Sequence, residues 1–273
     1  MPPFLLNFLR GFAMGSADLV PGVSGGTVAL VLGFYRRLVG NIRTGAGALS
    51  GLVRLDLDRF VERLGEIEWR FILPLFLGLL GAVLALSRLI EGLLENHPVR
   101  MAGLFFGLVA GSVVVAWRMV AQRDIPRLAW LAVTAIVTFF LLAFTAGTVV
   151  DPPVWGFFLA GAIAICAMIL PGISGSFLLL MMGMYAPVLN AVNERRIAVL
   201  AVFVIGIVIG LAAFSTLLNH LLDKYHDTVM AALVGLMVGS LRVLWPWPDG
   251  TDGTALAAPS GDVLVPVLLA VVG

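Results

Sequence analysis

Residues 17–27 read Ala-Asp-Leu-Val-Pro-Gly-Val-Ser-Gly-Gly-Thr, and residues 167–176 read Ala-Met-Ile-Leu-Pro-Gly-Ile-Ser-Gly-Ser. Each stretch places a Pro-Gly pair and a Ser-Gly pair between two apolar runs. Proline lacks a backbone N–H and glycine adopts backbone angles that other residues avoid, so a helix should break at each Pro-Gly pair. A new helix should begin near Ser24 and near Ser174, because serine is a preferred N-cap residue.

The beginning of such a helix is suited to binding an anion. Its first backbone N–H groups have no partner within the helix, and the helix dipole places partial positive charge there. Phosphate and carboxylate groups bind at such ends. The alternative is a tight turn at the membrane surface that joins two ordinary spans. The recurrence of the motif favours an anion-binding site.

The surrounding chain predicts an all-α polytopic membrane protein. Of its 273 residues, 60% are hydrophobic and 12% are charged, and the mean hydropathy is +1.06; soluble domains carry about 25% charged residues. The apolar runs are Phe4–Val20, Gly22–Tyr35, Phe71–Leu86, Met101–Trp117, Leu128–Gly147, Val154–Leu170, Gly172–Val192, Ile197–Leu218 and Val229–Trp245. A last run, Val263–Gly273, is shorter than the roughly 20 residues of a spanning helix, so we expect either an incomplete last span or a run that ends at a shallow depth.

The chain contains an internal repeat. Gly11 and Tyr35 have counterparts 150 residues later at Gly161 and Tyr185, and a later block of positions recurs at an offset of 128. We therefore expect a first repeat over residues 1–150 and a second over residues 151–273. The difference in offset corresponds to a polar insertion at about 41–70 in the first copy, which is expected to hold an amphipathic interfacial helix.

Each copy consists of a broken helix pair, re-entrant or made of two full spans, followed by three further crossings. An odd number of crossings inverts the second copy relative to the first, as in many transporters. Broken backbone is tolerated at membrane depth only where protein or a wet cavity receives it. The two breaks are therefore expected to meet near the midplane and to form one site from two halves.

The arginines predict the orientation. Arg10, the arginines between 36 and 70, Arg118, Arg123 and Arg127 fall on one side, whereas the other side has fewer basic residues and an acidic stretch near 249–262. The positive-inside rule places the first side, with the N-terminus, in the cytoplasm.

Several classes of function find no support. No basic tract suggests nucleic acid, and Cys166 with three histidines makes no metal-binding spacing, so neither metal nor cofactor is expected. An enzyme acting on lipid phosphates needs a nucleophile, base or metal, and the spans contain no histidine and almost no acidic residue. A small-ion or small-anion carrier or channel remains open, because broken helices also serve pores.

The two motifs, followed by Gly33-Phe34-Tyr35 and Gly183-Met184-Tyr185, resemble the polyprenyl-phosphate transporter family over nearly the whole chain. The resemblance implies a non-enzymatic flippase that returns undecaprenyl phosphate, the lipid carrier of cell-wall sugars, from the outer to the inner leaflet of a bacterial cytoplasmic (inner) membrane. It implies a substrate-binding set of Pro21, Gly22, Ser24, Gly25, Gly26, Thr27, Pro171, Gly172, Ser174, Gly175 and Ser176.

Asp18 is the main difference between the two motifs, since its counterpart is Met168. A carboxylate this close to the break should face the protected cavity, because it is costly against lipid. It can pair with an arginine such as Arg10 or Arg118, cap nearby backbone N–H groups, or take up a proton as the anionic lipid arrives and so couple transport to the proton gradient. Arg118 and Arg242 end spans, where arginines commonly extend to headgroups.

Overall fold

The computed structural model describes residues 2–20, 22–53, 56–144, 147–250 and 255–273. These residues form thirteen α-helices, one 3-10 helix and no strand. The part expected to be the first copy, residues 1–150, holds α1 (Pro3–Asp18), α2 (Gly25–Val31), α3 (Tyr35–Val53), α4 (Leu57–Glu66), α5 (Trp69–Asn96), α6 (Pro98–Arg118) and α7 (Ile125–Leu141). The part expected to be the second copy, residues 151–273, holds α8 (Val154–Ile169), α9 (Gly175–Met181), α10 (Tyr185–Asn193), α11 (Ile197–Lys224), α12 (His226–Ser240), η1 (Leu241–Leu244) and α13 (Leu264–Val272).

Four of the helices are long and apolar enough to cross a membrane: α5, α6, α11, and α12 together with η1. A fifth candidate is the pair α9 and α10, which is bent by 107° between Met181 and Tyr185, after the second Pro-Gly motif. The sequence predicted all five regions as apolar membrane segments. α7 and α8 are apolar but shorter, with 17 and 16 residues. The chain is thus a multi-pass helical membrane protein.

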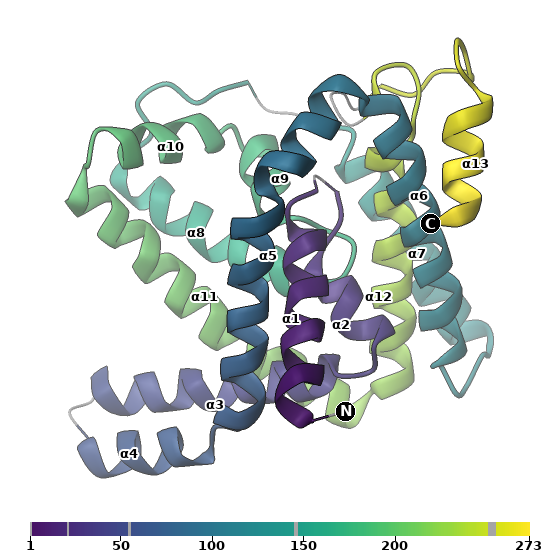
Figure 1. The fold of residues 1–273 in the computed structure, drawn as a ribbon. Coiled ribbons are helices and arrows are strands. Elements are labelled where there is room, and N and C mark those ends of the chain that lie inside the picture. The colour runs from purple at the N-terminus through teal and green to yellow at the C-terminus, as the bar shows by residue number, and fades with distance from the viewer. Residues whose placement is uncertain (1, 21, 54–55, 145–146, 251–254) are drawn as a thin grey trace.

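The first broken pair enters and leaves at the same end of the molecule. α2 has seven residues and is therefore about 10 Å long, far less than the roughly 30 Å of a bilayer core. The N-terminus and α3 both lie at the lower end in Figure 1. The chain thus returns, after the first break, to the end of the molecule at which α1 begins.

The two copies pack in the same way. α1 lies against α5, and α8 lies against α11. A Cβ atom on Gly11 would collide with the carbonyl oxygen of Leu75, and one on Gly161 would collide with that of Phe203. Position 203 is the counterpart of position 75 at the offset of 128. The glycines let the backbones touch, which is the usual basis of helix association in lipid.

Helices from one half of the chain also pack against helices from the other half. α6 packs against α13, whereas α12 packs against α7. A Cβ on Gly107 would meet Ala270, and one on Gly239 would lie 2.6 Å from the carbonyl oxygen of Ala135. The small residues on α6 and α12 therefore mark packing faces. Gly111 is an exception, since its added Cβ would face open space.

The insertion in the first copy forms a helical hairpin. α3 begins at Tyr35 and runs antiparallel to α4, and both lie at the lower end in Figure 1. The sequence predicted one amphipathic helix here, which is α4; α3 was not expected. α3 packs against α11, and its buried Asn41 accepts a hydrogen bond from the N–H of Glu68, the residue before α5, so tertiary contacts stabilise α3. α10, which follows the second break, lies at the opposite end (Figure 1).

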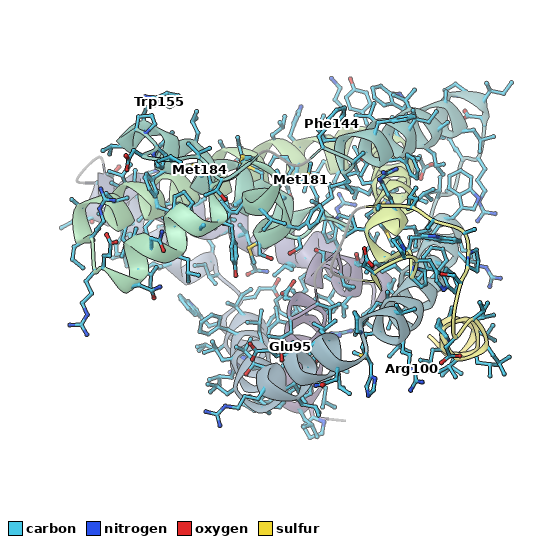
Figure 2. All side chains as sticks on the ribbon, turned by 90° about the horizontal axis from the view of Figure 1, so that it is seen from above. Glu95, Arg100, Phe144, Trp155, Met181 and Met184 are labelled. Atoms are coloured by element: carbon cyan, nitrogen blue, oxygen red, sulfur yellow. The ribbon has the colours of Figure 1, made fainter. Side chains whose placement is uncertain are left out.

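Seen from above, the upper end carries the turns of both halves. Trp155, Met181 and Met184 gather over α8–α10, and Glu95 and Arg100 lie over the turn between α5 and α6 (Figure 2). Arg100 pairs with Asp262 at 3.1 Å, which ties the start of α6 to the segment before α13. The described residues of the two breaks, 22–26 and 171–175, are buried in the protein.

Candidate functional site

The first break connects α1 to α2. Ser24 is the N-cap of α2, with extended backbone angles, and its Oγ accepts a hydrogen bond from the N–H of Gly26 at 3.1 Å. Gly22 has φ +81°, a left-handed conformation that favours glycine. The predicted break and restart are therefore present where the motif places them. Pro21, also predicted for the site, lies outside the described residues.

Asp18 occupies the beginning of α2. Its Oδ1 accepts a hydrogen bond from the N–H of Gly25 at 2.7 Å. A Cβ atom on Gly25 would lie 2.7 Å from Oδ2 of the same carboxylate, so Asp18 fills the space in front of that glycine. Of the three roles considered for Asp18, the structure thus shows the N–H cap. Among the described residues Asp18 makes no ion pair; Arg10 lies over the ring of Phe34 at 5.2 Å.

The second break connects α8 to α9 and is uncapped. Gly172 has φ +87°, which matches Gly22. Ser174 precedes α9, but its Oγ lies 2.8 Å from Oγ of Ser176 and caps no backbone N–H. Within the described chain, the N–H groups of Gly175 and Ser176 have no acceptor. Met168 stands where the first copy has Asp18, and a Cβ on Gly175 would lie 2.5 Å from its Cγ.

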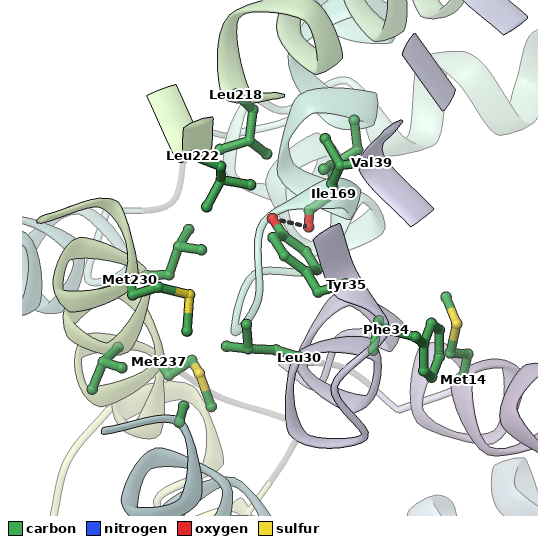
Figure 3. Close-up of a cluster of buried hydrophobic side chains, with 14 of the residues drawn as sticks. Met14, Leu30, Phe34, Tyr35, Val39, Ile169, Leu218, Leu222, Met230 and Met237 are labelled. Atoms are coloured by element: carbon green, nitrogen blue, oxygen red, sulfur yellow. Dashed lines mark hydrogen bonds between the residues drawn. The ribbon is translucent and has the colours of Figure 1, made fainter. Parts of the chain in front are cut away.

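The two breaks contact each other directly. The N–H of Gly172 donates to Oγ1 of Thr27 at 2.9 Å, and Oγ of Ser24 donates to the carbonyl oxygen of Leu170 at 3.1 Å. Below them, the hydroxyl of Tyr35 donates to the carbonyl oxygen of Ile169 at 3.1 Å (Figure 3). The structure thus brings together the two motifs, which lie about 150 residues apart in the sequence.

The breaks are buried and polar. Ser24 is 1% exposed, Thr27 0% and Ser174 8%, whereas Ser176 is exposed. Buried polar groups need hydrogen-bond partners, and the first break has them internally. The second break leaves hydroxyl and N–H donors available. The arrangement can therefore offer several donors to one anion from the side of α9.

The predicted arginines lie outside this contact. Arg118 is exposed at the end of α6. Arg242 lies over the ring of Phe139 at 4.7 Å and lines a cavity of about 390 Å³. It is near the first break, because the next residue, Val243, would lie 3.0 Å from a Cβ on Gly22. No group of three or more metal-ligating side chains occurs among the described residues.

Sequence reasoning predicted Ser24, Thr27 and Gly172, but it missed other residues that join the two breaks. Leu170 and Ile169 act through their carbonyl oxygens, which no side-chain pattern reveals. Tyr35 could have been found, because it recurs as Tyr185. The two tyrosines differ, however: Tyr35 is 4% exposed and Tyr185 is 44% exposed. The repeat is therefore asymmetric at its site.

Comparison with known proteins gives a consistent family. Residues 14–258 match the VCA0040-like family, described as undecaprenyl phosphate translocase-like. A polyprenyl-phosphate transporter of Vibrio cholerae is 42% identical over 246 residues, which cover 90% of this chain and 79% of the relative. A polyprenyl-phosphate transporter of Staphylococcus aureus is 31% identical over 263 residues, which cover 88% of this chain and 86% of the relative. No solved structure matches. The chain belongs to the VCA0040-like, undecaprenyl phosphate translocase-like family.

Proposed function

We propose that this protein carries undecaprenyl phosphate, or a similar polyprenyl phosphate, from the outer to the inner leaflet of a bacterial cytoplasmic membrane. The observation that carries the proposal is the direct contact between the two Pro-Gly-x-Ser-Gly breaks, through Thr27 with Gly172 and through Ser24 with Leu170. The relatives named polyprenyl-phosphate transporters supply the substrate class. In this proposal the phosphate binds at the breaks.

The second break receives the phosphate first. Its donors are the N–H groups of Gly175 and Ser176 and the hydroxyls of Ser174 and Ser176, and Met168 adds no charge beside them. Hydrogen bonds to a charged group are worth about 1.5–3 kcal/mol each. Several such bonds offset the cost of taking a phosphate out of water.

The first break is closed by Asp18. A phosphate can reach the N–H of Gly25 only when the carboxylate leaves it, because Asp18 holds that donor at 2.7 Å and like charges repel. Protonation of Asp18 removes that charge. The proposal therefore assigns Asp18 to coupling: a proton binds as the phosphate engages both breaks, and it leaves on the cytoplasmic side.

The prenyl chain follows the apolar surface beside the first break. A cavity of about 650 Å³ lies between α1, α2 and α6, and Ala17, Val23, Val28, Phe105 and Leu108 are among its lining residues. Ala17 and Val23 flank the first break itself. The prenyl chain therefore stays in contact with apolar side chains while polar groups hold the phosphate. The hydrocarbon is then not exposed to water, and the phosphate is not exposed to lipid.

An inverted pair of repeats gives the carrier access to both leaflets. α3 follows the first break at one end of the molecule, and α10 follows the second break at the other end (Figure 1). The arginine-rich end, with the N-terminus, faces the cytoplasm in this proposal. Rocking of one repeat against the other then exposes the breaks to each leaflet in turn.

Reconstitution into liposomes tests the proposal. A fluorescent polyprenyl phosphate is placed in one leaflet, and its protection from a membrane-impermeant quencher is followed with wild-type protein and with Ser176→Ala, matched against Ser87→Ala on α5. We expect lipid movement with the wild type and the control, slowed by Ser176→Ala. Ion flux without lipid movement would favour a channel or small-ion carrier, and release of inorganic phosphate would favour an enzyme; either result alone would refute the proposal.

A further inference from the structure

A second polar cavity lies away from the breaks, at the end of the molecule that carries the α3–α4 hairpin. It has a volume of about 600 Å³ and lies between α3, α4 and α11. Its lining includes Arg37, Asn41, Arg43, Arg59, Arg63 and Glu68. None of these side chains belongs to the two motifs. The family resemblance and the proposed transport route do not use them.

The described lining has a surplus of positive charge. It carries four arginines and two glutamates. Arg37 pairs with Glu68, and Arg63 pairs with Glu66 at 2.9 Å. Within the described chain, the guanidinium groups of Arg43 and Arg59 make no ion pair or hydrogen bond. The N–H donors of these two guanidinium groups therefore line a cavity and have no anionic partner among the described residues. Guanidinium groups bind phosphate oxygens through pairs of parallel hydrogen bonds.

The rim of this cavity is held in place before any ligand binds. Asn41, 8% exposed, donates to the carboxylate of Glu68 at 3.1 Å and accepts from its backbone N–H at 2.8 Å. Arg37 lies 4.2 Å over the ring of Phe71. Hydrogen bonds from Arg37 and Asn41 hold the pKa of Glu68 below its usual value, so this carboxylate stays charged at neutral pH. Binding at a rim ordered in this way costs little conformational entropy.

An apolar cavity adjoins the charged one. It has a volume of about 310 Å³ and shares Asn41 and Ala46 with its neighbour. Its other lining residues, from α3, α5, α11 and the segment between α4 and α5, include Ile42, Leu49, Ile67, Trp69, Ile72 and Leu211. A charged cavity that continues into an apolar one matches a molecule with an anionic head and a hydrocarbon tail. Basic cavities at the cytoplasmic ends of membrane helices bind lipid headgroups.

We propose that this paired cavity, at the α3–α4 end, binds a prenyl phosphate as a second site, with its phosphate between Arg43 and Arg59 and the first part of its chain along Ile42 and Trp69. This inference rests on the proposed function, since it names the place that receives the lipid on the cytoplasmic side. The charge selects the monoester: a phosphate monoester carries close to two negative charges at neutral pH, which match the two unpaired arginines. A phosphodiester lipid such as phosphatidylglycerol carries one.

Photolabelling tests the second site. Wild-type protein in phosphatidylcholine nanodiscs is labelled with a diazirine-bearing farnesyl phosphate, and the labelled peptides are identified by mass spectrometry. Labels are expected on α3–α4 and, separately, at the breaks. The double variant Arg43→Gln/Arg59→Gln should lose α3–α4 labelling by about ten-fold for each arginine and keep the labels at the breaks. Arg70→Gln, an exposed arginine at the same end that does not line the cavity, should label like the wild type.

A second variant guards against a folding defect. Arg43→Lys/Arg59→Lys keeps both charges but loses the paired hydrogen bonds, and an intermediate loss of α3–α4 labelling supports the assignment. Labels at the breaks without labels on α3–α4 in the wild type would overturn the second site and leave the proposed function intact. Equal competition by phosphatidylglycerol, or by inorganic phosphate, would overturn the assignment to a prenyl phosphate. Labels on α3–α4 without lipid transport in liposomes would instead overturn its role as a receiving site.

Discussion

At the scale of single residues, Asp18 and Met168 make the two breaks unequal. The carboxylate of Asp18 caps the N–H of Gly25 at 2.7 Å, whereas the N–H of Gly175 has no acceptor in the described chain. A buried N–H without a partner is costly, so an uncapped break is expected where a ligand completes it. The difference between Asp18 and Met168 therefore decides which of the two breaks is open.

Replacement of Asp18 separates its two roles. Asp18→Asn keeps an oxygen that accepts from Gly25 but cannot carry a proton, so the fold should be retained while transport loses its dependence on pH. Asp18→Ala should lower the free energy of unfolding by about 0.5–2 kcal/mol, the usual cost of losing a cap. Thermal unfolding in detergent and transport between pH 6 and 9 measure the two effects; Met168→Leu serves as control. A wild-type pH profile for Asp18→Asn would make Asp18 purely structural.

The hydroxyl of Thr27 joins the two breaks, so replacing Thr27 tests their contact directly. Thr27→Val keeps the shape of the side chain but leaves the buried N–H of Gly172 without its acceptor. We expect a loss of about 1–3 kcal/mol in the free energy of unfolding and weaker binding of prenyl phosphate. Thr27→Ser, which retains the hydroxyl, should lose about 1 kcal/mol through one buried methyl group. Wild-type stability of the Thr27→Val variant would show that the hydrogen bond between the breaks contributes nothing.

At the scale of helices, the sequence predicted what local chemistry decides. The Pro-Gly pairs predicted both breaks, Ser24 was correctly placed as an N-cap, and the apolar runs predicted the long helices. It did not predict α3, whose residues are mixed in polarity and are stabilised by Asn41 and by contact with α11. It left the capping of Gly25 by Asp18 as one of three alternatives, because the choice depends on how α1 approaches α2.

Close packing between α1 and α5 predicts that two glycines at this interface, Gly11 and Gly81, differ sharply in their tolerance of alanine. Gly11→Ala should prevent stable folding, because the new methyl group would collide with the backbone of Leu75, which cannot move aside. Gly81→Ala should be tolerated, since its Cβ would lie 3.6 Å from the ring of Phe8, an ordinary contact. The yield of monodisperse protein in detergent and its melting temperature report the result. Similar behaviour of both variants would contradict the packing described here.

At the scale of the whole molecule, the account depends on two ends that face opposite compartments. In a Cys166→Ser background, cysteines at Arg123 and at Asp151 should react with a membrane-impermeant reagent from opposite sides, Arg123 from the cytoplasm. The motivation is the arginine asymmetry and the separation of α3 from α10 (Figure 1). Cysteines at Arg63 and Glu194 provide a second pair. Reaction of both members of a pair from one side would contradict the inverted arrangement.

The central claim is that one phosphate is held by both breaks. The most direct measurement is the position of phosphorus in a structure determined with bound polyprenyl phosphate. We predict phosphate oxygens within about 2.7–3.2 Å of the donors of residues 174–176, and, once Asp18 has left Gly25, of the donors of residues 24–27. A phosphate bound only elsewhere, with Asp18 still on Gly25 and the N–H groups of Gly175 and Ser176 unoccupied, would contradict the account.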